Sequence, residues 1–155
     1  MNSIAETDTN NLYNPQMSDI GIQKSSNNGS ASYSVNAGFE DYPVAYVSWF
    51  DAARYANWLA NGKPAGSQGP TTTEDGAYEL ASSSIIRNSI NPNTGAPPAF
   101  WLLNEREWYT SAYLKSDGTA LWNYPSQNNT APDANGANPS NLANFGGVFG
   151  ETTPI

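Results

Sequence analysis

The side chains that most often perform enzyme chemistry are scarce in this chain of 155 residues, which contains neither cysteine nor histidine. The chain as it stands therefore cannot supply a thiol nucleophile, an imidazole base or a zinc-finger ligand set. No Walker loop, dinucleotide-binding fingerprint or EF-hand loop occurs in it. These residue types favour a binding domain over a catalytic one.

The acidic side chains offer one pair with the spacing of a hydrolase. Glu105 and Glu107 could be imagined as the two carboxylates of a glycosidase, which lie about 5–10 Å apart. They also follow Asn104 at the expected start of a helix, where carboxylates interact favourably with the helix dipole. We favour this helix-start role, and Glu74-Asp75-Gly76 is in the same way typical of a turn.

Two aromatic residues in a turn-rich segment are candidates for ligand contact. Trp122 and Tyr124 lie beside Pro125. Their rings could stack on a glycan or grip a protein or peptide, since aromatic rings offer flat apolar area at low entropic cost. Anchoring of a long loop is the alternative role.

Charge excludes one class of partner. The formal net charge is −8, and the six Lys and Arg residues are scattered, whereas nucleic-acid binding needs clustered cations. No run approaches the about 20 apolar residues of a membrane span. We therefore expect neither a nucleic-acid partner nor a membrane span.

The clearest predicted element is a helix over residues 49–60. Ser48 offers an N-cap hydroxyl, and Asp51 can complete a capping box with it. Gly62 can end the helix in the left-handed conformation. A β-prone run, residues 43–47, precedes the helix. The expected apolar face of the helix consists of Ala52, Tyr55, Ala56 and Leu59.

A second unit of the same kind follows later in the chain. Residues 100–103 (FWLL) are typical of a short buried strand. Asn104 caps the next helix, Glu107 completes its capping box, and the helix extends to about Leu114. We expect the indole rings of both units to lie in the core: Trp49, Trp58, Trp101 and Trp108.

The remaining segments predict little regular structure. Short strands are expected at residues 32–35, 77–80 and 85–86, and a turn is expected at 71–76. The rest of residues 1–42 and 63–98 reads as loop. Two strand-to-helix units separated by long loops predict an α+β fold.

Four segments resemble one protein family. Residues 43–59 (PVAYVSWFDAARYANWL) resemble the signature helix of the formylglycine-generating enzyme family, the sulfatase-modifying factor domain. Residues 101–108 (WLLNEREW) resemble its second signature, with Trp101, Leu103 and Asn104 in place of the usual Arg, Pro and Thr. Residues 72–78 (TTEDGAY) and 122–125 (WNYP) resemble an exported bacterial branch of the family.

The resemblance implies a loop-rich, C-type-lectin-like fold. It also implies that residues 1–155 form a single partial domain, truncated at both ends. The family's first strand and helix would precede Met1, and its C-terminal core segments would follow Ile155. It further implies an exported location, which is periplasmic, at the cell surface or secreted.

The resemblance implies two alternatives for function. Active members use copper held by two cysteines near the end of the domain, and such soft thiolates suit Cu(I). Those cysteines would lie beyond residue 155. We favour a noncatalytic ligand- or protein-binding domain. The alternative is part of a copper-dependent oxidase that converts a sulfatase cysteine to formylglycine, and a structural wall protein is a third possibility.

The family also implies a calcium site. Ala143-Asn144-Phe145 matches its Ala-Asn-apolar segment, in which Asn144 would offer a side-chain oxygen and Phe145 a carbonyl. The next acid is Glu151, in a loop that looks shortened. An asparagine that only stabilises a turn is the alternative.

Overall fold

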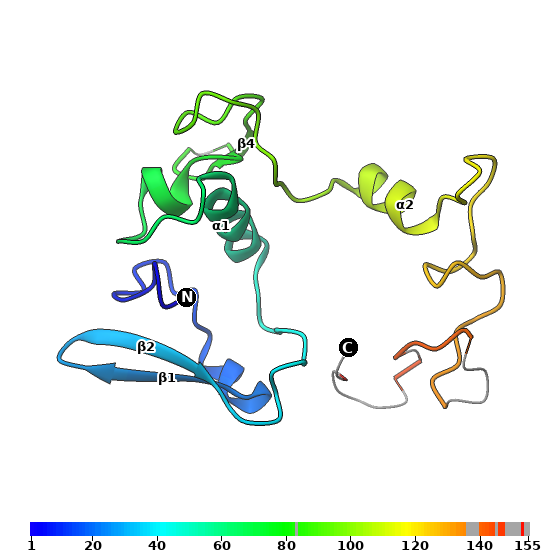
Figure 1. The fold of residues 1–155 in the computed structure, drawn as a ribbon, viewed down its shortest axis with the longest axis horizontal. Helices are drawn as coiled ribbons and strands as arrows, with labels where there is room; N and C mark the ends of the chain where they lie inside the picture. Colours follow the sequence, from blue (N-terminus) through cyan, green and yellow to red (C-terminus); the bar gives the residue numbers. More distant parts are fainter. Residues whose placement is uncertain (83, 136–139, 145, 148–152, 154–155) are drawn as a thin grey trace. The chain divides into compact units, whose positions relative to one another are not determined.

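The computed structural model describes residues 1–82, 84–135, 140–144, 146–147 and 153. The chain divides into two compact units, an N-terminal unit (Met1–Leu102) and a C-terminal unit (Leu103–Ile155), each of which is described by itself. The described part contains two α-helices and two antiparallel two-stranded sheets (Figure 1). This arrangement confirms the mixed α+β class.

Helix α1 (Trp49–Ala60) begins where the sequence predicts, because Ser48 and Asp51 form a capping box. The Asp51 amide donates to the Ser48 hydroxyl oxygen at 3.2 Å, and the Ser48 amide donates to the Asp51 carboxylate at 2.9 Å. Gly62 follows the helix in the left-handed conformation, with φ of 81°. Both ends of α1 are therefore determined by local sequence.

The buried face of α1 differs from the expected apolar face. Tyr55 is 58% exposed, whereas Ala53, Ala56 and Asn57 are buried. The two alanines form a core cluster with the segment that contains β3 (Tyr78–Glu79). Small side chains let this segment approach the helix closely, and the larger Tyr55 is left on the surface.

Asparagine amides hold the loops around α1. Asn57 is completely buried; its Nδ2 donates to the carbonyls of Thr73 and Tyr78, both at 2.9 Å, and its Oδ1 accepts from the Tyr78 amide at 2.7 Å. One turn later Asn61 donates to the Asp75 carbonyl at 2.8 Å. Buried backbone groups need partners, and here the amide side chains provide them in place of a larger sheet.

The first sheet is a hairpin that the sequence analysis missed. Strand β1 (Ile22–Asn27) pairs with β2 (Ser30–Val35), of which only residues 32–35 were expected. Asn28 and Gly29 join the strands with φ of 50° and 85°. An Asn-Gly pair with two positive φ values is typical of a two-residue hairpin turn. β1 was missed because most of its residues are polar.

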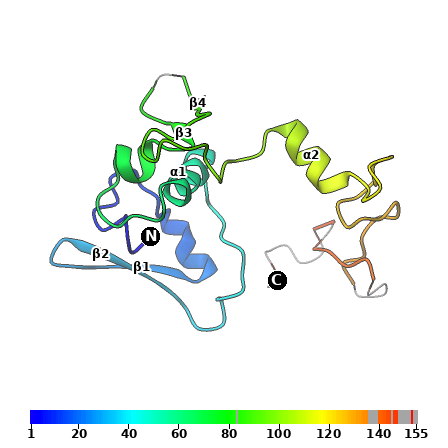
Figure 2. The same ribbon diagram turned by 45° about the horizontal axis from the view of Figure 1, so that its top comes forward.

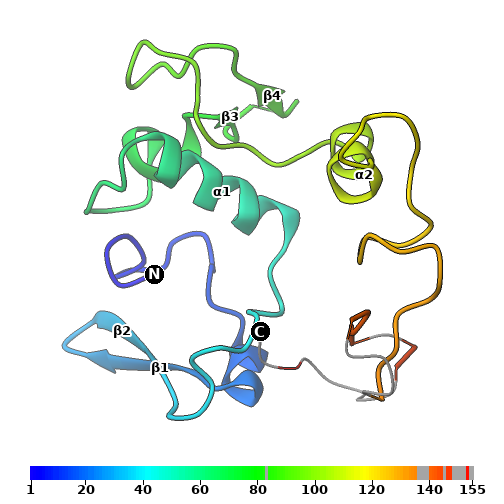
Figure 3. The ribbon, with the colours of Figure 1, turned by 45° about the vertical axis from the view of Figure 1, so that its right-hand side comes forward.

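The N-terminal segment lies between this hairpin and α1 (Figures 1 and 3). Its Ile4, Ala5 and Leu12 form a second buried cluster, against which Tyr33 of β2 and Trp58 of α1 pack. Residues expected to be simple loop therefore supply part of the core. A short 3₁₀ helix, η1 (Pro15–Ile20), connects this segment to β1.

The second sheet pairs β3 with β4 (Ile86–Arg87), close to the strands predicted at 77–80 and 85–86. The label β3 lies beside α1 in Figure 2, and the two elements are in contact. Residues 71–76, expected as a turn, belong largely to the π-helical turn η2 (Pro70–Glu74). The small sheet and η2 together cover the buried face of α1.

The prediction of a short strand before each helix is wrong. Residues 43–47 form no strand, since Pro43 lacks an amide donor and Tyr46 has a positive φ of 59°. Residues 100–103 form no strand either. Instead, the Tyr78 hydroxyl donates to the Leu102 carbonyl at 3.0 Å and accepts from the Leu102 amide at 2.9 Å. One side chain thus takes the place of a strand partner.

The prediction of four core tryptophans is wrong for three of them. Trp49, Trp101 and Trp108 are 45%, 39% and 49% exposed. Trp58 is half-buried, and its indole NH donates to the Pro64 carbonyl at 2.8 Å. The buried apolar side chains of the N-terminal unit are instead mostly alanines and aliphatic residues, together with Tyr78.

The C-terminal unit contains helix α2 (Glu105–Tyr113), which confirms the second predicted helix. Asn104 accepts from the Glu107 amide at 2.9 Å, and the Glu107 carboxylate accepts from the Asn104 amide at 3.0 Å. No residue of α2 is buried. Its helical conformation therefore depends strongly on this cap.

Candidate binding pocket

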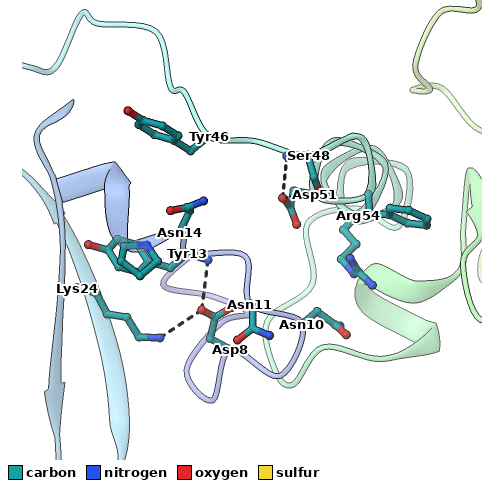
Figure 4. Close-up of a pocket in the computed structure, with 12 residues that line it drawn as sticks. Asp8, Asn10, Asn11, Tyr13, Asn14, Lys24, Tyr46, Ser48, Asp51 and Arg54 are labelled. Carbon is teal, nitrogen blue, oxygen red and sulfur yellow. Dashed lines mark hydrogen bonds and ion pairs between the residues drawn. The ribbon is translucent and has the colours of Figure 1, made fainter. Parts of the chain in front are cut away.

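An open pocket of about 750 Å³ lies in the N-terminal unit. Three segments line it: residues 8–15 of the N-terminal segment, Lys24 of β1, and residues 46–54 at the start of α1. Figure 4 shows side chains from all three around one space. Its volume is in the range of about 300–1,000 Å³ that is typical of ligand pockets.

Lys24 and Asp8 form the wall nearest the hairpin. The Lys24 ammonium lies 3.2 Å from the Asp8 carboxylate, whose side chain is only 3% exposed. The same carboxylate accepts from the Leu12 and Tyr13 amides at 2.7 and 3.2 Å. The ammonium also lies 5.7 Å from the ring centres of Tyr13 and Tyr33. These contacts fix the position of both charges.

The surroundings of Lys24 and of the neighbouring Tyr33 raise the pKa values of both side chains. Burial lowers the pKa of Lys24, but the hydrogen bond and charge of Asp8 and the nearby Tyr33 outweigh it, so the pKa is raised. Burial, followed by the charge of Asp8, raises the pKa of Tyr33. At neutral pH, Lys24 is therefore a cation and Tyr33 is uncharged.

Arg54 and Glu74 form a second, more enclosed ion pair. Arg54 donates from Nε and Nη2 to the two Glu74 oxygens at 2.8 and 3.1 Å. Their side chains are only 15% and 17% exposed. Asn10 also donates to Glu74 at 2.8 Å. The fork of Arg54 is thus occupied by a carboxylate within the chain.

Three lining residues have positive φ values, and one of them is strained. Asp8, Asn11 and Tyr46 have φ of 46°, 53° and 59°. Asp and Asn adopt this region with little difficulty, but a bulky Tyr does so only where its surroundings impose it. Such strain concentrates at functional sites. The backbone conformation of Tyr46, at the edge of the pocket, is therefore imposed by the fold.

The pocket also presents exposed aromatic surface. Tyr46 and Phe50 are 43% and 46% exposed. Asn11 is exposed beside them in the lining, and Asn14 is half-buried. The lining therefore combines apolar rings with amide groups.

The predicted ligand residues Trp122 and Tyr124 lie in the C-terminal unit. Both are half-buried. The Lys115 ammonium lies 4.6 Å from the centre of the Trp122 ring, and the Trp122 amide donates to the Tyr113 carbonyl at 2.8 Å. Their role in binding stays a prediction.

Only part of the predicted calcium site can be placed. Asn144 is exposed. Phe145 and Glu151 lie outside the described residues. Among the described residues there is no group of three or more acidic side chains that could hold a metal ion. The described residues thus supply one oxygen ligand of the predicted set, and the site stays a prediction.

Sequence reasoning missed the pocket because its residues come from separate segments, read as loop, strand and the start of a helix. Two signals could have drawn attention to it: the Asp8-Thr9-Asn10-Asn11 run, whose Asp and Asn residues tolerate positive φ, and the aromatic residues that flank Ser48. Neither signal shows that these segments meet.

The family of the chain can be decided by comparison. Residues 6–151 match the family model of the sulfatase-modifying factor enzyme 1-like domain. The chain belongs to this family. No curated protein and no solved structure is significantly similar to it.

The sulfatase-modifying-factor-like domain thus covers nearly the whole chain, which confirms the resemblance found in its signature segments. Among the described residues, no helix has the length and hydropathy needed to cross a bilayer. The 155 residues contain no cysteine. They therefore cannot provide the thiolate pair that would hold Cu(I).

Proposed function

We propose that this sulfatase-modifying-factor-like domain binds a ligand without catalysing a reaction, as part of an exported bacterial protein with a lectin-type fold. The observation that supports this proposal is the pocket between the N-terminal segment, β1 and α1. Its charged side chains are held by hydrogen bonds before any ligand arrives. A preorganised site loses little conformational entropy on binding.

No catalytic step is assigned to these residues. A thiolate-bound Cu(I) does not fit this chain, which contains no cysteine. The runner-up function is an oxidase that converts a sulfatase cysteine to formylglycine, with its cysteines beyond residue 155. That function would depend on residues outside this sequence.

One experiment separates these functions. The full-length parent protein is incubated with Cu(I), oxygen and a peptide carrying a sulfatase-type cysteine, and the peptide is examined by mass spectrometry. We expect the cysteine to be unchanged. Conversion to formylglycine would establish the oxidase instead, and a cysteine pair encoded after residue 155 would point the same way.

The binding function has a direct test. Full-length protein is screened by thermal shift against neutral oligosaccharides and against short peptides, and responses are confirmed by calorimetry. We expect at least one class to raise the melting temperature. The rise should disappear in Phe50→Ala, which alters the pocket, and persist in Tyr55→Ala, which removes another exposed ring elsewhere on α1.

A further inference from the structure

We infer that the pocket takes a neutral, polyhydroxylated ligand, that is, a short uncharged glycan. The inference rests on the proposed binding function and adds the chemical class of the ligand. Three properties of the lining support it: its cations are already paired with carboxylates, its available polar groups both donate and accept, and its exposed rings are flat and apolar.

The first property is charge compensation. Lys24 pairs with Asp8, and Arg54 pairs with Glu74 in bidentate geometry. An anionic ligand would have to displace a carboxylate from one of these cations. The displaced carboxylate would stay in a largely enclosed position without its partner, which is strongly unfavourable.

The acid at the start of α1 is also engaged. The Asp51 carboxylate accepts from the Ser48 amide at 2.9 Å and from its hydroxyl at 2.6 Å. It is therefore committed to the helix cap. Both cations of the lining are thus paired and the Asp51 carboxylate is held by Ser48, so the lining favours a neutral ligand over an anionic one.

The second property is the chemistry of the available polar groups. Among the described residues, neither the Asn11 side chain nor the Asn14 amide nitrogen has a hydrogen-bond partner, and the Tyr46 hydroxyl has none either. A side-chain amide donates through its nitrogen and accepts through its oxygen, and a phenol does both. Sugar hydroxyl groups also donate and accept, so they match this set.

The third property is the aromatic surface. The Tyr46 and Phe50 rings line the pocket and are nearly half exposed. Such rings pack against the apolar C–H face of a sugar, which pairs apolar contact with nearby hydrogen bonds.

A peptide fits the lining less well. Extended peptides are commonly bound by addition to an exposed strand edge, where main-chain hydrogen bonds supply affinity. Only Lys24 of β1 lines the pocket, and Figure 4 shows its side chain reaching across to Asp8. The pocket therefore presents side chains instead of a strand edge.

The test uses the full-length protein and four probes: cellotriose, maltotriose, chitotriose and mannotriose. A uronic-acid trisaccharide and trialanine serve as the anionic and peptide comparisons. Binding is measured by saturation-transfer-difference NMR and by calorimetry. We expect at least one neutral trisaccharide to bind and the anionic trisaccharide to bind at least tenfold more weakly.

Two variants locate the binding. Tyr46→Gly removes the ring and places at this position the residue that best tolerates positive φ. The variant should therefore keep or raise the melting temperature while binding falls at least tenfold. Phe50→Ala should also weaken binding, and Tyr55→Ala should leave it unchanged.

The outcomes separate the two proposals. If trialanine or the anionic sugar binds, and this binding is lost in Tyr46→Gly and Phe50→Ala, the pocket binds ligand but the glycan inference is wrong. If a neutral sugar binds equally well to Tyr46→Gly and Phe50→Ala, the inference is wrong about the site. If no probe binds, both the inference and the proposed binding function fail.

Discussion

Asn57 shows at the scale of a single residue how this chain stabilises its loops. Its amide joins α1 to the carbonyl of Thr73 and to both backbone groups of Tyr78, with no solvent access. In the sequence it is one asparagine among many, and its neighbours suggest only a position on a helix. Its role exists because the segment after η2 returns to the helix.

Replacement of Asn57 by alanine tests that role. The change leaves three buried backbone groups without partners, and we expect it to lower the free energy of unfolding by about 3 kcal/mol. Denaturant titration provides the measurement. Asn36→Ala, in an exposed position after β2, is the matched control and should cost less than about 0.5 kcal/mol. Equal effects of the two substitutions would contradict this account.

The contacts of Lys24 and Tyr33 predict a loss of stability in alkali. Both pKa values are raised by folding, so the folded state retains protons that the unfolded state releases above pH of about 10. Their contribution is present below that pH and is lost as the pH rises through the folded-state values. We expect the melting temperature to fall above about pH 10. Tyr33→Phe should flatten the decline; an unchanged slope would show that Tyr33 has no part in it.

Asn144 provides the test of the calcium proposal. If calcium binds the folded domain alone, a hundredfold excess over Kd adds about 2.7 kcal/mol to the free energy of unfolding. We expect the melting temperature of the full-length protein to rise with calcium and the rise to be lost in Asn144→Ala. Magnesium is the control ion, since it requires smaller, more regular coordination. If calcium leaves the melting temperature unchanged and Asn144→Ala has no effect, the proposal of a calcium site at Asn144 is wrong.

At the scale of elements, the two helices show where local sequence is sufficient. Both begin at capping boxes that can be read directly from the sequence, Ser48 with Asp51 and Asn104 with Glu107. The hairpin is equally local, and its Asn28-Gly29 turn is a strong signal that was passed over because β1 is polar. The strands expected at 43–47 and 100–103 were wrong because a strand also needs a partner, which local sequence does not specify.

The cap of α2 can be tested by Asn104→Ala. A helix of nine residues with no buried side chain is marginal by itself, so loss of the N-cap should destabilise it by about 1 kcal/mol. We expect Cα chemical shifts of residues 105–113 to move toward coil values. Asn104→Asp retains an oxygen acceptor and should preserve them. Identical shifts in both variants would show that other contacts hold α2.

At the scale of the whole molecule, the most unusual feature is the number of large exposed side chains in both units. Trp49, Phe50 and Trp108 are each about half exposed. The buried cores contain mostly small residues, short aliphatic side chains and asparagine amides. Soluble domains seldom present so much apolar surface, which promotes association.

The exposed rings predict that residues 1–155 bind apolar dyes and self-associate. We expect anilinonaphthalene sulfonate fluorescence to increase on mixing, and sedimentation velocity to show concentration-dependent growth. Trp108→Gln should reduce association, because it removes one exposed ring from α2. Arg106→Gln is the control on the same helix. A monomeric protein with no dye response would contradict the prediction.

The sequence by itself determined the family, the mixed α+β class, both helices with their caps, and the sites of the short β3–β4 strands. Each of these depends on residues close together in the chain. The tertiary structure decided which face of α1 is buried, which tryptophans are exposed, and that residues 8–15, Lys24 and the start of α1 surround one pocket. These features depend on contacts between segments that are distant in sequence, and hydrophobic periodicity does not encode which segments meet.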